Sequence, residues 1–298
     1  MAAPPTVSVI MPTYNAAPFI GEAIGSVLAQ DMPDFELLVV NDGSTDGTGE
    51  IVRSFTDPRV RVVDQPANLG IACSVNVALA LSRGRFAARL DSDDIMLPHR
   101  LSTQVAFLEH HPEVFGVGSD MRAFGDVSGD TDLPEHDAEI KVMLAVGRNN
   151  LANPAMMFRL ELVRQFRLQH SPRYGAADDL EFWITCMRHG AIYANIKQVL
   201  VYHRIRDGSA SGQGIPMAQH LFADILGDLF PMMTREDMWN VACPLAHDVL
   251  SVEQIVATRD ALDRLPHPTP TRYGENRDLL HQTMRLLGRQ MRELLSAT

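Results

Sequence analysis

The chain has 298 residues, of which 46% are hydrophobic and 21% charged, so neither a disordered nor a collagen-like protein fits its composition. Its formal net charge is −11. The stretch from Asp91 to Ile140 holds 12 acidic residues against two arginines, so one segment carries nearly the whole excess. Because a general nucleic-acid binder needs a basic face to neutralise phosphates, this balance argues against nucleic acid as a partner.

The cysteines and the termini point to an intracellular compartment. Cys73, Cys186 and Cys243 are far apart and form no CxxC pair, which is typical of free thiols in a reducing environment. The N-terminus lacks the pattern of a signal peptide, and no run of about 18 uncharged apolar residues predicts a transmembrane segment. We therefore expect a cytoplasmic protein, with peripheral contact at the inner face of a membrane as the alternative.

The first half of the chain alternates short β-branched runs with amphipathic stretches. The runs predict strands over Val7–Met11, Phe35–Asn41, Arg59–Asp64 and Phe86–Asp91. The stretches between them predict helices over Phe19–Gln30, Thr45–Phe55 and Ile71–Ser82. This alternation predicts an α/β fold with a Rossmann-like, mostly parallel sheet flanked by helices.

The second half is less regular and ends in helices. We expect further strands over Val114–Val117 and Gln198–Tyr202, an acidic loop over Gly125–Asp137, and a helix over Asp179–Arg188. Beyond these, helices are predicted over Met217–Phe230, Val252–Leu262 and Asn276–Leu295. We therefore expect a first domain over residues 1–212 and a helical C-terminal extension over residues 213–298.

Three predicted strands end in polar segments: Pro12-Thr-Tyr-Asn15, Asn41-Asp-Gly-Ser-Thr-Asp-Gly47 and Asp91-Ser-Asp-Asp94. Ligands of open parallel sheets bind beyond the carboxyl ends of the strands, so these segments are expected to meet at one edge. The Asp91/Asp93 pair suits Mn²⁺ or Mg²⁺ bridging to a diphosphate, and Asp42 suits a base N–H. The competing interpretation is local, with Asp94, Ser44 or Thr45 capping the helices that follow.

In this order and spacing, the segments resemble the family 2 inverting glycosyltransferases with the GT-A fold. Four motifs carry the resemblance: Val7-Ser-Val-Ile-Met-Pro-Thr-Tyr-Asn15, Leu38-Val-Val-Asn-Asp-Gly-Ser-Thr-Asp-Gly-Thr48, Asn68-Leu-Gly-Ile-Ala-Cys-Ser-Val-Asn76 and Leu90-Asp-Ser-Asp-Asp94. It is strong over roughly residues 6–120 and looser to about residue 211. It implies a nucleotide-sugar donor and a divalent cation.

The resemblance places the donor and the cation on particular residues. For the nucleoside and the diphosphate it implies Pro12, Thr13, Tyr14, Asn15, Asp42, Asn68, Gly70, Asn76, Asp91 and Ser92, and for the metal it implies Asp91 and Asp93. Many relatives carry an arginine before the asparagine that corresponds to Asn76. This chain has Val75 there, so one phosphate contact is expected to be missing.

The family's catalytic base is the Asp of a Glu-Asp pair that precedes a Trp-containing helix. In the matching stretch, Tyr174 to Trp183, Asp179 falls on the base and Asp178 replaces the Glu. An inverting transfer needs such a carboxylate to take the proton of the acceptor hydroxyl opposite the leaving diphosphate. We expect Asp178 to serve also as the N-cap of the following helix.

A later family segment, Tyr-Arg-x-His, resembles Tyr202-His-Arg-Ile-Arg-Asp-Gly-Ser209 with one departure. Arg204 matches the family arginine, but Arg206 occupies the position of the histidine. Either His203 replaces that histidine at the metal, or Arg206 contacts the diphosphate and weakens metal dependence. An ordinary surface loop is the third interpretation. A weaker similarity over Asn153–Arg159 implies a wall of the donor or acceptor pocket.

The resulting hypothesis is a metal-dependent, inverting, non-processive hexosyltransferase. Asp42 is compatible with uracil, which favours a UDP-sugar over GDP- and dTDP-sugars, and the acceptor is expected to be a carbohydrate or a lipid-linked sugar. Polysaccharide, lipopolysaccharide or glycoconjugate assembly is the expected setting. The alternatives are a catalytically weak or inactive protein that binds nucleotide or carbohydrate, and a nucleotidyltransferase, which the absence of a basic Gly-rich loop after the first strand disfavours.

The C-terminal extension lies outside the resemblance. Its last predicted helix has arginines beside an apolar seam. The seam consists of Leu280, Met284, Leu287, Met291 and Leu294. We expect this seam to dock on the first domain or to form a homodimer. An interfacial helix on an anionic membrane is the alternative, which the acidic residues of this helix weaken.

Overall fold

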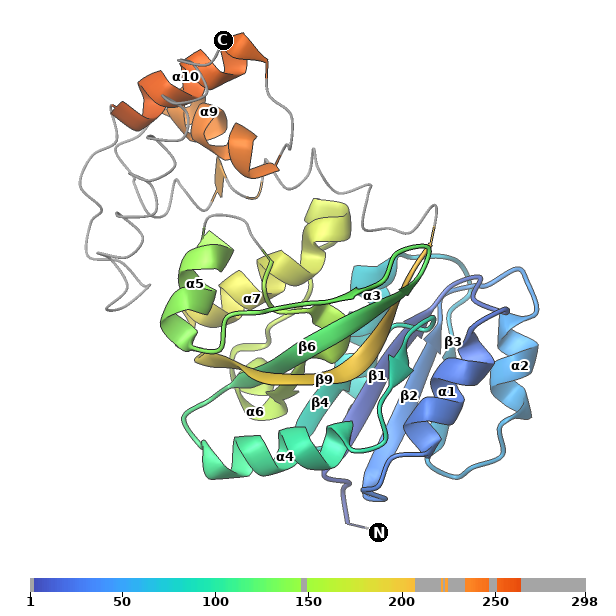
Figure 1. Cartoon of the computed structure of the whole chain (residues 1–298). Helices are drawn as coiled ribbons and strands as arrows, with labels where there is room; N and C mark the ends of the chain where they lie inside the picture. Colours follow the sequence, from blue (N-terminus) through green and yellow to red (C-terminus); the bar gives the residue numbers. More distant parts are fainter. Residues whose placement is uncertain are drawn as a thin grey trace. The chain divides into compact units, whose positions relative to one another are not determined.

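The computed structural model describes residues 3–145, 149–206, 234–246 and 251–263, together with residues 221, 223 and 224 (Figure 1). The chain divides into two compact units. The first comprises Met1–Asp137, Leu151–Pro172 and Ala191–Ser209, and the second comprises Ala138–Asn150, Arg173–Gly190 and Ala210–Thr298. The domain boundary predicted at residue 212 lies outside the described residues and stays a prediction.

The first unit is built on one mixed sheet. Within the described residues its strands follow the order β3-β2-β1-β4-β8-β6-β9-β5, and β7 pairs with β6. Their bounds are β1 Val7–Thr13, β2 Phe35–Asn41, β3 Val60–Asp64, β4 Phe86–Arg89, β5 Ile95–Met96, β6 Gly116–Gly125, β7 Gly129–Asp130, β8 Met157–Arg159 and β9 Tyr193–Ile205. The strands β3, β2, β1 and β4 are parallel, whereas β8 is antiparallel to β4 and β6.

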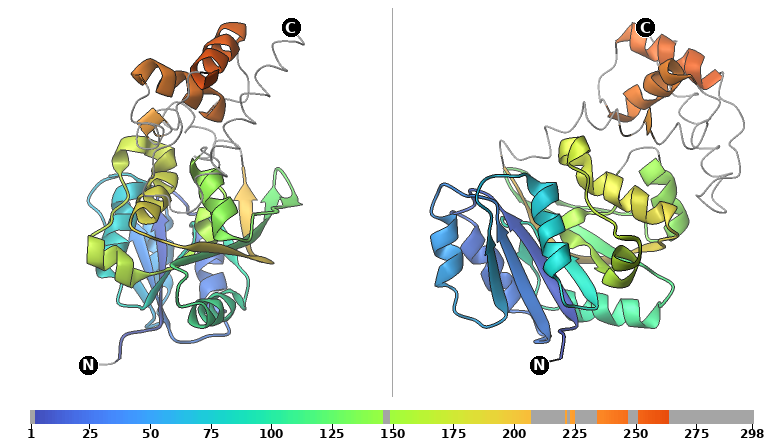
Figure 2. Two further views of the ribbon diagram at one scale, coloured as in Figure 1. Left: turned by 90° about the vertical axis from the view of Figure 1, so that its left-hand side faces the viewer. Right: turned by 180° about the vertical axis from the view of Figure 1, so that it is seen from behind.

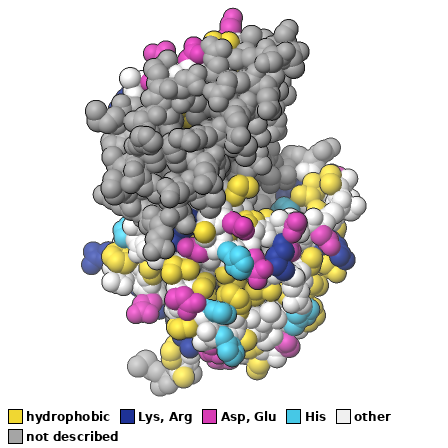
Figure 3. Space-filling model, turned by 60° about the vertical axis from the view of Figure 1, so that its left-hand side comes forward, with side chains coloured by type: hydrophobic (Ala, Val, Ile, Leu, Met, Phe, Trp, Pro, Cys, Tyr) yellow, Lys and Arg dark blue, Asp and Glu magenta, His cyan; other side chains and the backbone are white. Residues whose placement is uncertain are grey.

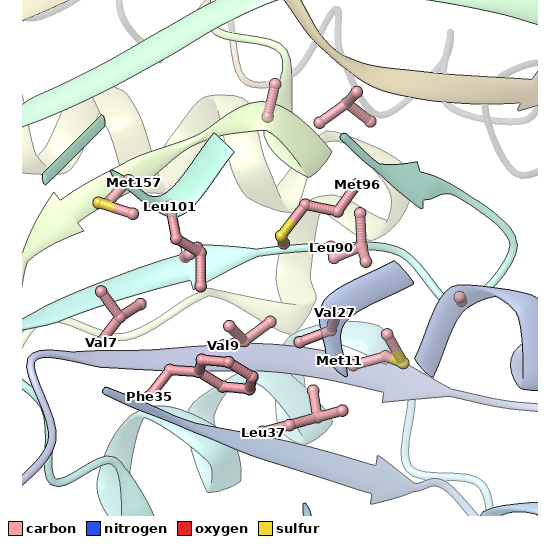
Figure 4. Close-up of a cluster of buried hydrophobic side chains, with 14 of the residues drawn as sticks. Val7, Val9, Met11, Val27, Phe35, Leu37, Leu90, Met96, Leu101 and Met157 are labelled. Carbon is pink, nitrogen blue, oxygen red and sulfur yellow. The ribbon is translucent and has the colours of Figure 1, made fainter. Parts of the chain in front are cut away.

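Helices cover both faces of the parallel part of the sheet (Figures 1 and 2). The helices of this unit are α1 Ile20–Leu28, α2 Thr48–Ser54, α3 Ile71–Leu81, α4 Arg100–His110 and α6 Leu160–Phe166, with the 3-10 turn η1 at Asn153–Ala155. Alternate residues of β1 such as Val9 and Met11 pack with Val27 of α1 and Leu101 of α4 (Figure 4). The α3 helix lies on the opposite face, so both faces of these strands are buried.

The predicted strands and helices of the first half are confirmed, but two later strands are much longer than predicted. The β6 strand runs to Gly125 and β9 spans 13 residues, where the sequence predicted Val114–Val117 and Gln198–Tyr202. The register between them shifts at Ser119/Asp120 and at Asp120/Met121. Because such irregularities insert extra residues, they break the period-two pattern from which a strand is predicted.

The acidic segment predicted as a loop contains the β7 hairpin partner of β6 and the first residue of helix α5 (Asp137–Ala145). Its acids hold this part of the sheet together. Asp130 pairs with Arg122 at 2.7 Å, and Asp132 pairs with Lys197 of β9 at 2.5 Å. Most of the segment is thus a loop, as predicted, and these ion pairs attach it to the margin of the sheet.

The second unit contains α7 (Asp178–Arg188), α9 (Arg235–Ala246), α10 (Val252–Asp263) and most of α5, and the turn η2 (Pro172–Ala177) leads into it. The α10 helix confirms the prediction over Val252–Leu262, whereas α9 was not predicted. The hydroxyl of Thr258 in α10 donates to the carbonyl of Asn240 in α9 at 2.7 Å. Asn276–Leu295 and most of Met217–Phe230 lie outside the described residues. In the described part, no helix is long and apolar enough to cross a membrane.

A buried carboxylate joins three strands of the first unit. Glu36 of β2 is 2% exposed and accepts hydrogen bonds from Ser8 Oγ at 2.7 Å, from Arg83 Nε at 2.9 Å and from Arg61 Nη1. Burial raises the pKa of Glu36, but the hydrogen bonds from Ser8, Arg83 and Arg61 outweigh burial and hold it below its usual value. The ionised form therefore stabilises the fold.

We predict that Glu36→Gln lowers the free energy of unfolding at pH 7 by about 2 kcal/mol, because an amide cannot accept all of these donors. A carboxyl with a lowered native pKa contributes stability above its unfolded pKa and loses it as the pH falls through the native pKa. The difference between wild type and variant should therefore shrink below about pH 4.5. Urea unfolding of both proteins at pH 7 and below about pH 4.5 measures this difference in the free energy of unfolding. Glu109→Gln, at an exposed pair with Arg85, is the control and should change little.

Candidate active site

The polar segments that end β1, β2 and β4 lie at one edge of the sheet. Thr13 is in register with Asn41, and Arg89 of β4 is in register with Ile10 of β1. The strands are parallel neighbours, so their carboxyl ends point the same way. The convergence expected from the sequence is thus present within the first unit.

The loops that follow β1 and β2 brace each other. Asn15 has a left-handed backbone with φ of 48°, and its amide oxygen accepts from Thr45 N at 2.8 Å. In return, Asn15 N donates to Ser44 Oγ at 3.0 Å, and Asp46 accepts from Ala17 N at 3.1 Å. Ser44 and Thr45 therefore hold this loop, and the prediction that they cap a helix is wrong, since α2 begins at Thr48 after Gly47.

The residues around these loops differ in accessibility. Pro12 is buried in β1 opposite Val40, and the Thr13 hydroxyl is buried without a hydrogen-bond partner in the described residues. The Tyr14 side chain is 46% exposed. Of the residues that the sequence assigned to the donor here, Tyr14 and Asn15 are the exposed ones.

Asp42 holds a second loop in place. It is 3% exposed, and its carboxylate accepts from Gln65 Nε2 at 2.7 Å, Leu69 N at 2.8 Å and Gly70 N at 2.9 Å. Next to it, Gly43 has a φ of +67°, and a Cβ there would lie 2.5 Å from the carbonyl carbon of Ala67. Asp42 therefore shapes the loop that leads into α3, besides the base contact expected from the sequence.

Two further predicted donor residues are also used inside the protein. Asn68 Oδ1 accepts from Gly70 N at 3.0 Å. Asn76 of α3 makes a reciprocal pair with the backbone of His170, donating to its carbonyl and accepting from its N–H, both at 2.8 Å. Val75, which precedes Asn76, is 1% exposed and packs in the core.

We predict that Asp42→Asn destabilises the protein by about 1–3 kcal/mol, because its amide group would face a backbone N–H that then lacks an acceptor. Asn68→Ala removes only a partly exposed bond and should cost less. Chemical denaturation measures both free energies. Equal effects of the two variants would contradict the structural role of Asp42.

The acidic motif after β4 is paired with basic side chains. Asp91 Oδ1 accepts from Arg89 Nη2 at 2.9 Å, and Asp93 Oδ2 accepts from Arg206 Nε at 3.1 Å. Ser92 lies half-buried in the turn closed by Asp94 N and the Asp91 carbonyl. Arg89 is only 1% exposed, whereas Asp91 is 29% exposed, so a buried cation reaches a carboxylate near the surface.

Asp94 joins this motif to the end of β9. It is completely buried and accepts from His203 Nδ1 at 3.0 Å and from Arg204 N at 2.8 Å. Burial raises the pKa of Asp94 to about 6, and the hydrogen bond to Asp94 raises the pKa of His203. Asp94 is not a helix cap, because the N-cap of α4 is His99.

Arg204 is fixed from several sides. Its Nε donates to the Asp93 carbonyl at 2.9 Å, and its Nη2 donates to Glu22 at 2.7 Å. Its guanidinium lies 4.9 Å from the ring centre of Phe19 and 4.4 Å from that of Phe124. The interpretation of Tyr202–Ser209 as an ordinary surface loop is thereby weakened for Arg204 and Arg206, which both contact the acidic motif.

Asp178 and Asp179 open α7 in the second unit. The N-cap is Ala177, without a side-chain hydrogen bond, so the prediction that Asp178 is the N-cap is wrong, and the helix begins at Asp178 itself. Asp178 is 5% exposed. Asp179 is half-buried, and its carboxylate accepts from Asn149 Nδ2 at 2.8 Å and from Leu180 N at 2.7 Å. Both carboxylates lie where the positive end of the helix dipole favours negative charge.

The sequence reasoning missed several residues of the site. Arg89 and Arg100 are fully buried, and Arg100 donates to the carbonyls of Arg89, Pro154 and Met156. A signal for Arg89 existed, because an arginine in the apolar strand Phe86–Arg89 needs a buried partner. Phe19 and Glu22, which hold Arg204, gave no comparable signal.

Comparison with known proteins identifies the chain. The family model described as glycosyl transferase family 2 matches residues 8–171. An uncharacterized glycosyltransferase of Haemophilus influenzae is 30% identical over 223 residues, which cover 70% of this chain and 68% of that protein. The chain is a family 2 glycosyltransferase. The putative glycosyltransferase EpsE of Bacillus subtilis is 31% identical to it over 211 residues, with 69% and 74% covered.

Solved structures confirm the GT-A fold of this glycosyltransferase. Residues 1–349 of S. aureus TarS, in complex with UDP-GlcNAc, match with a TM-score of 0.67 and 21% identity over 97% of this chain and 88% of that chain. The mannosyltransferase PcManGT from Pyrobaculum calidifontis, in complex with GDP-Man and Mn²⁺, matches with a TM-score of 0.58 and 22% identity over 99% and 84%.

Proposed function

We propose that this glycosyltransferase moves a sugar from a nucleoside diphosphate sugar, with UDP favoured, to an acceptor hydroxyl with inversion and without processive elongation. The acceptor is a carbohydrate or lipid-linked sugar of polysaccharide, lipopolysaccharide or glycoconjugate assembly. A homodimer through the C-terminal helices belongs to the same proposal. A relative from Bacillus subtilis, TuaG, is named for teichuronic acid biosynthesis and is 30% identical over 70% of this chain, which supports the polysaccharide setting.

The observation that carries the proposal is the arrangement at the ends of β1, β2 and β4. The exposed ring of Tyr14 and the loop held by Asp42 lie at the same sheet edge as the Asp91-Ser-Asp93 motif. A flat aromatic surface, backbone groups and paired acids beside arginines suit a base, a ribose and a diphosphate in that order. TarS with UDP-GlcNAc and PcManGT with GDP-Man share the fold.

The donor set at this edge fits a hard divalent cation. Two carboxylates two residues apart match the oxygen ligands that Mn²⁺ and Mg²⁺ prefer, and Asp93 is 19% exposed, so a ligand can reach it. In the described residues, no group of three or more His, Cys, Asp or Glu side chains converges on one point. Asp91 and Asp93 would hold the cation together with phosphate oxygens and water. When bound, it would supply positive charge to the leaving diphosphate.

The proton transfer is assigned to Asp179. Its carboxylate would take the proton of the acceptor hydroxyl while the oxygen forms a bond to the anomeric carbon. The bond from that carbon to the diphosphate breaks with its electron pair on the leaving oxygen. The configuration at the anomeric carbon is therefore inverted, and no covalent enzyme intermediate forms. Asn149, which donates to Asp179, orients the carboxylate. Asp178 would add negative charge beside it.

We predict that Asp179→Asn lowers the transfer rate by at least about 100-fold, since it removes the general base, while the donor dissociation constant stays within about twofold. Product formation and isothermal titration calorimetry with the donor measure the two quantities. Glu181→Gln, the same kind of change two residues along α7, is the matched control and should retain transfer. Wild-type turnover by Asp179→Asn would remove it from the role of base.

We predict that UDP with Mn²⁺ raises the melting temperature by several degrees, and that GDP and dTDP raise it less. Asp93→Ala should abolish most of the Mn²⁺-dependent part of this shift, because the cation would lose a carboxylate. Differential scanning fluorimetry with each nucleotide, with and without Mn²⁺, gives the comparison. Stabilisation by GDP and none by UDP would overturn the assignment of the nucleotide.

A further inference from the structure

Arg206, which the family resemblance places at a histidine position, reaches the acidic motif. Arg206 Nε lies 3.1 Å from Asp93 Oδ2, and its guanidinium lies 5.2 Å from the ring centre of Phe19. The side chain of Arg206 is 43% exposed. The guanidinium of Arg206 therefore pairs with the carboxylate of Asp93, which is expected to bind a metal ion.

The partners of the three carboxylates differ in how easily they can be displaced. The partner of Asp91 is Arg89, which is 1% exposed. The partner of Asp94 is His203, which is 25% exposed. Arg204 is held by Glu22, by the Asp93 carbonyl and by two rings. Arg206 is the most exposed of these cations, and an exposed ion pair contributes little stability. It can leave Asp93 at small energetic cost.

We propose that Arg206 and a divalent cation are alternative counter-ions of Asp93, and that the diphosphate draws Arg206 away from this carboxylate. The proposal rests on the function proposed above. Without metal or nucleotide, Arg206 neutralises Asp93. When a diphosphate binds, the Arg206 guanidinium turns from Asp93 to the phosphates, with which it can form two parallel hydrogen bonds. Asp93 would hold a bound divalent cation in place of Arg206, and Arg206 would then face the diphosphate.

Two consequences of opposite sign follow from this exchange. A metal ion that binds before the nucleotide must displace Arg206 from Asp93, so Arg206 weakens metal binding to the free protein. The same guanidinium strengthens binding of a nucleoside diphosphate in the absence of metal. A purely structural role for the Arg206–Asp93 pair would not move the two affinities in opposite directions.

The test compares Arg206→Gln with wild type in two titrations on the full chain. Mn²⁺ binding without nucleotide is followed by electron paramagnetic resonance, and binding of UDP and of GDP in EDTA is followed by calorimetry. We expect Arg206→Gln to bind Mn²⁺ about threefold more tightly or better, and the nucleotide without metal about tenfold more weakly. Arg206→His, which restores the family residue, should bind Mn²⁺ more tightly still.

Arg85→Gln is the matched control. Arg85 also stacks on a phenylalanine ring, at 4.5 Å from the ring centre of Phe86, and forms an exposed ion pair with Glu109 at the opposite end of the strands. It should leave both affinities unchanged. If Arg206→Gln changes neither affinity, or only one, the exchange is overturned. If wild type binds neither UDP nor GDP with or without Mn²⁺, the proposed function fails instead.

Discussion

The candidate site depends on one buried carboxylate. Asp94 is completely buried, and it can stay there only because His203 and the backbone of Arg204 supply hydrogen bonds from a strand more than a hundred residues later in the chain. This contact fixes the end of β9 against the turn after β4. Arg204 and Arg206 are thereby brought to Asp93, with Arg204 on its carbonyl and Arg206 on its carboxylate. The pairing of β9 with β5 and the contacts of Arg204 with Glu22 and Phe124 reinforce this placement.

The acidity of the chain has a local explanation. The net charge of −11 arises almost entirely between Asp91 and Ile140. The structure pairs most of these acids with specific partners, as in Asp130 with Arg122 and Asp132 with Lys197. On the face drawn in Figure 3, acidic side chains are scattered among histidine, basic and apolar ones. Part of this charge therefore attaches the segment around β7 to β6 and β9.

The sequence predicted the parts of the fold that obey simple periodicity. Strands β1, β2 and β4 are apolar runs followed by polar turns, so their positions and their common edge follow from pattern alone. The β9 strand was underestimated because its register shifts against β6. The predicted N-cap residues were wrong for a related reason, because the position of a cap depends on where the chain turns into the helix. Ser44 bonds to Asn15 across the loop and not to the helix that follows it.

Asn76 shows how a binding residue expected from a motif can instead transmit position. Its amide copies the donor and acceptor of a peptide group, so it fastens His170 to α3 as a neighbouring strand would. The same helix starts at the loop that Asp42 holds, and two residues after His170 the chain enters the turn that leads to Asp178. The α3 helix therefore connects, within the first unit, the loop that Asp42 holds to the segment at His170.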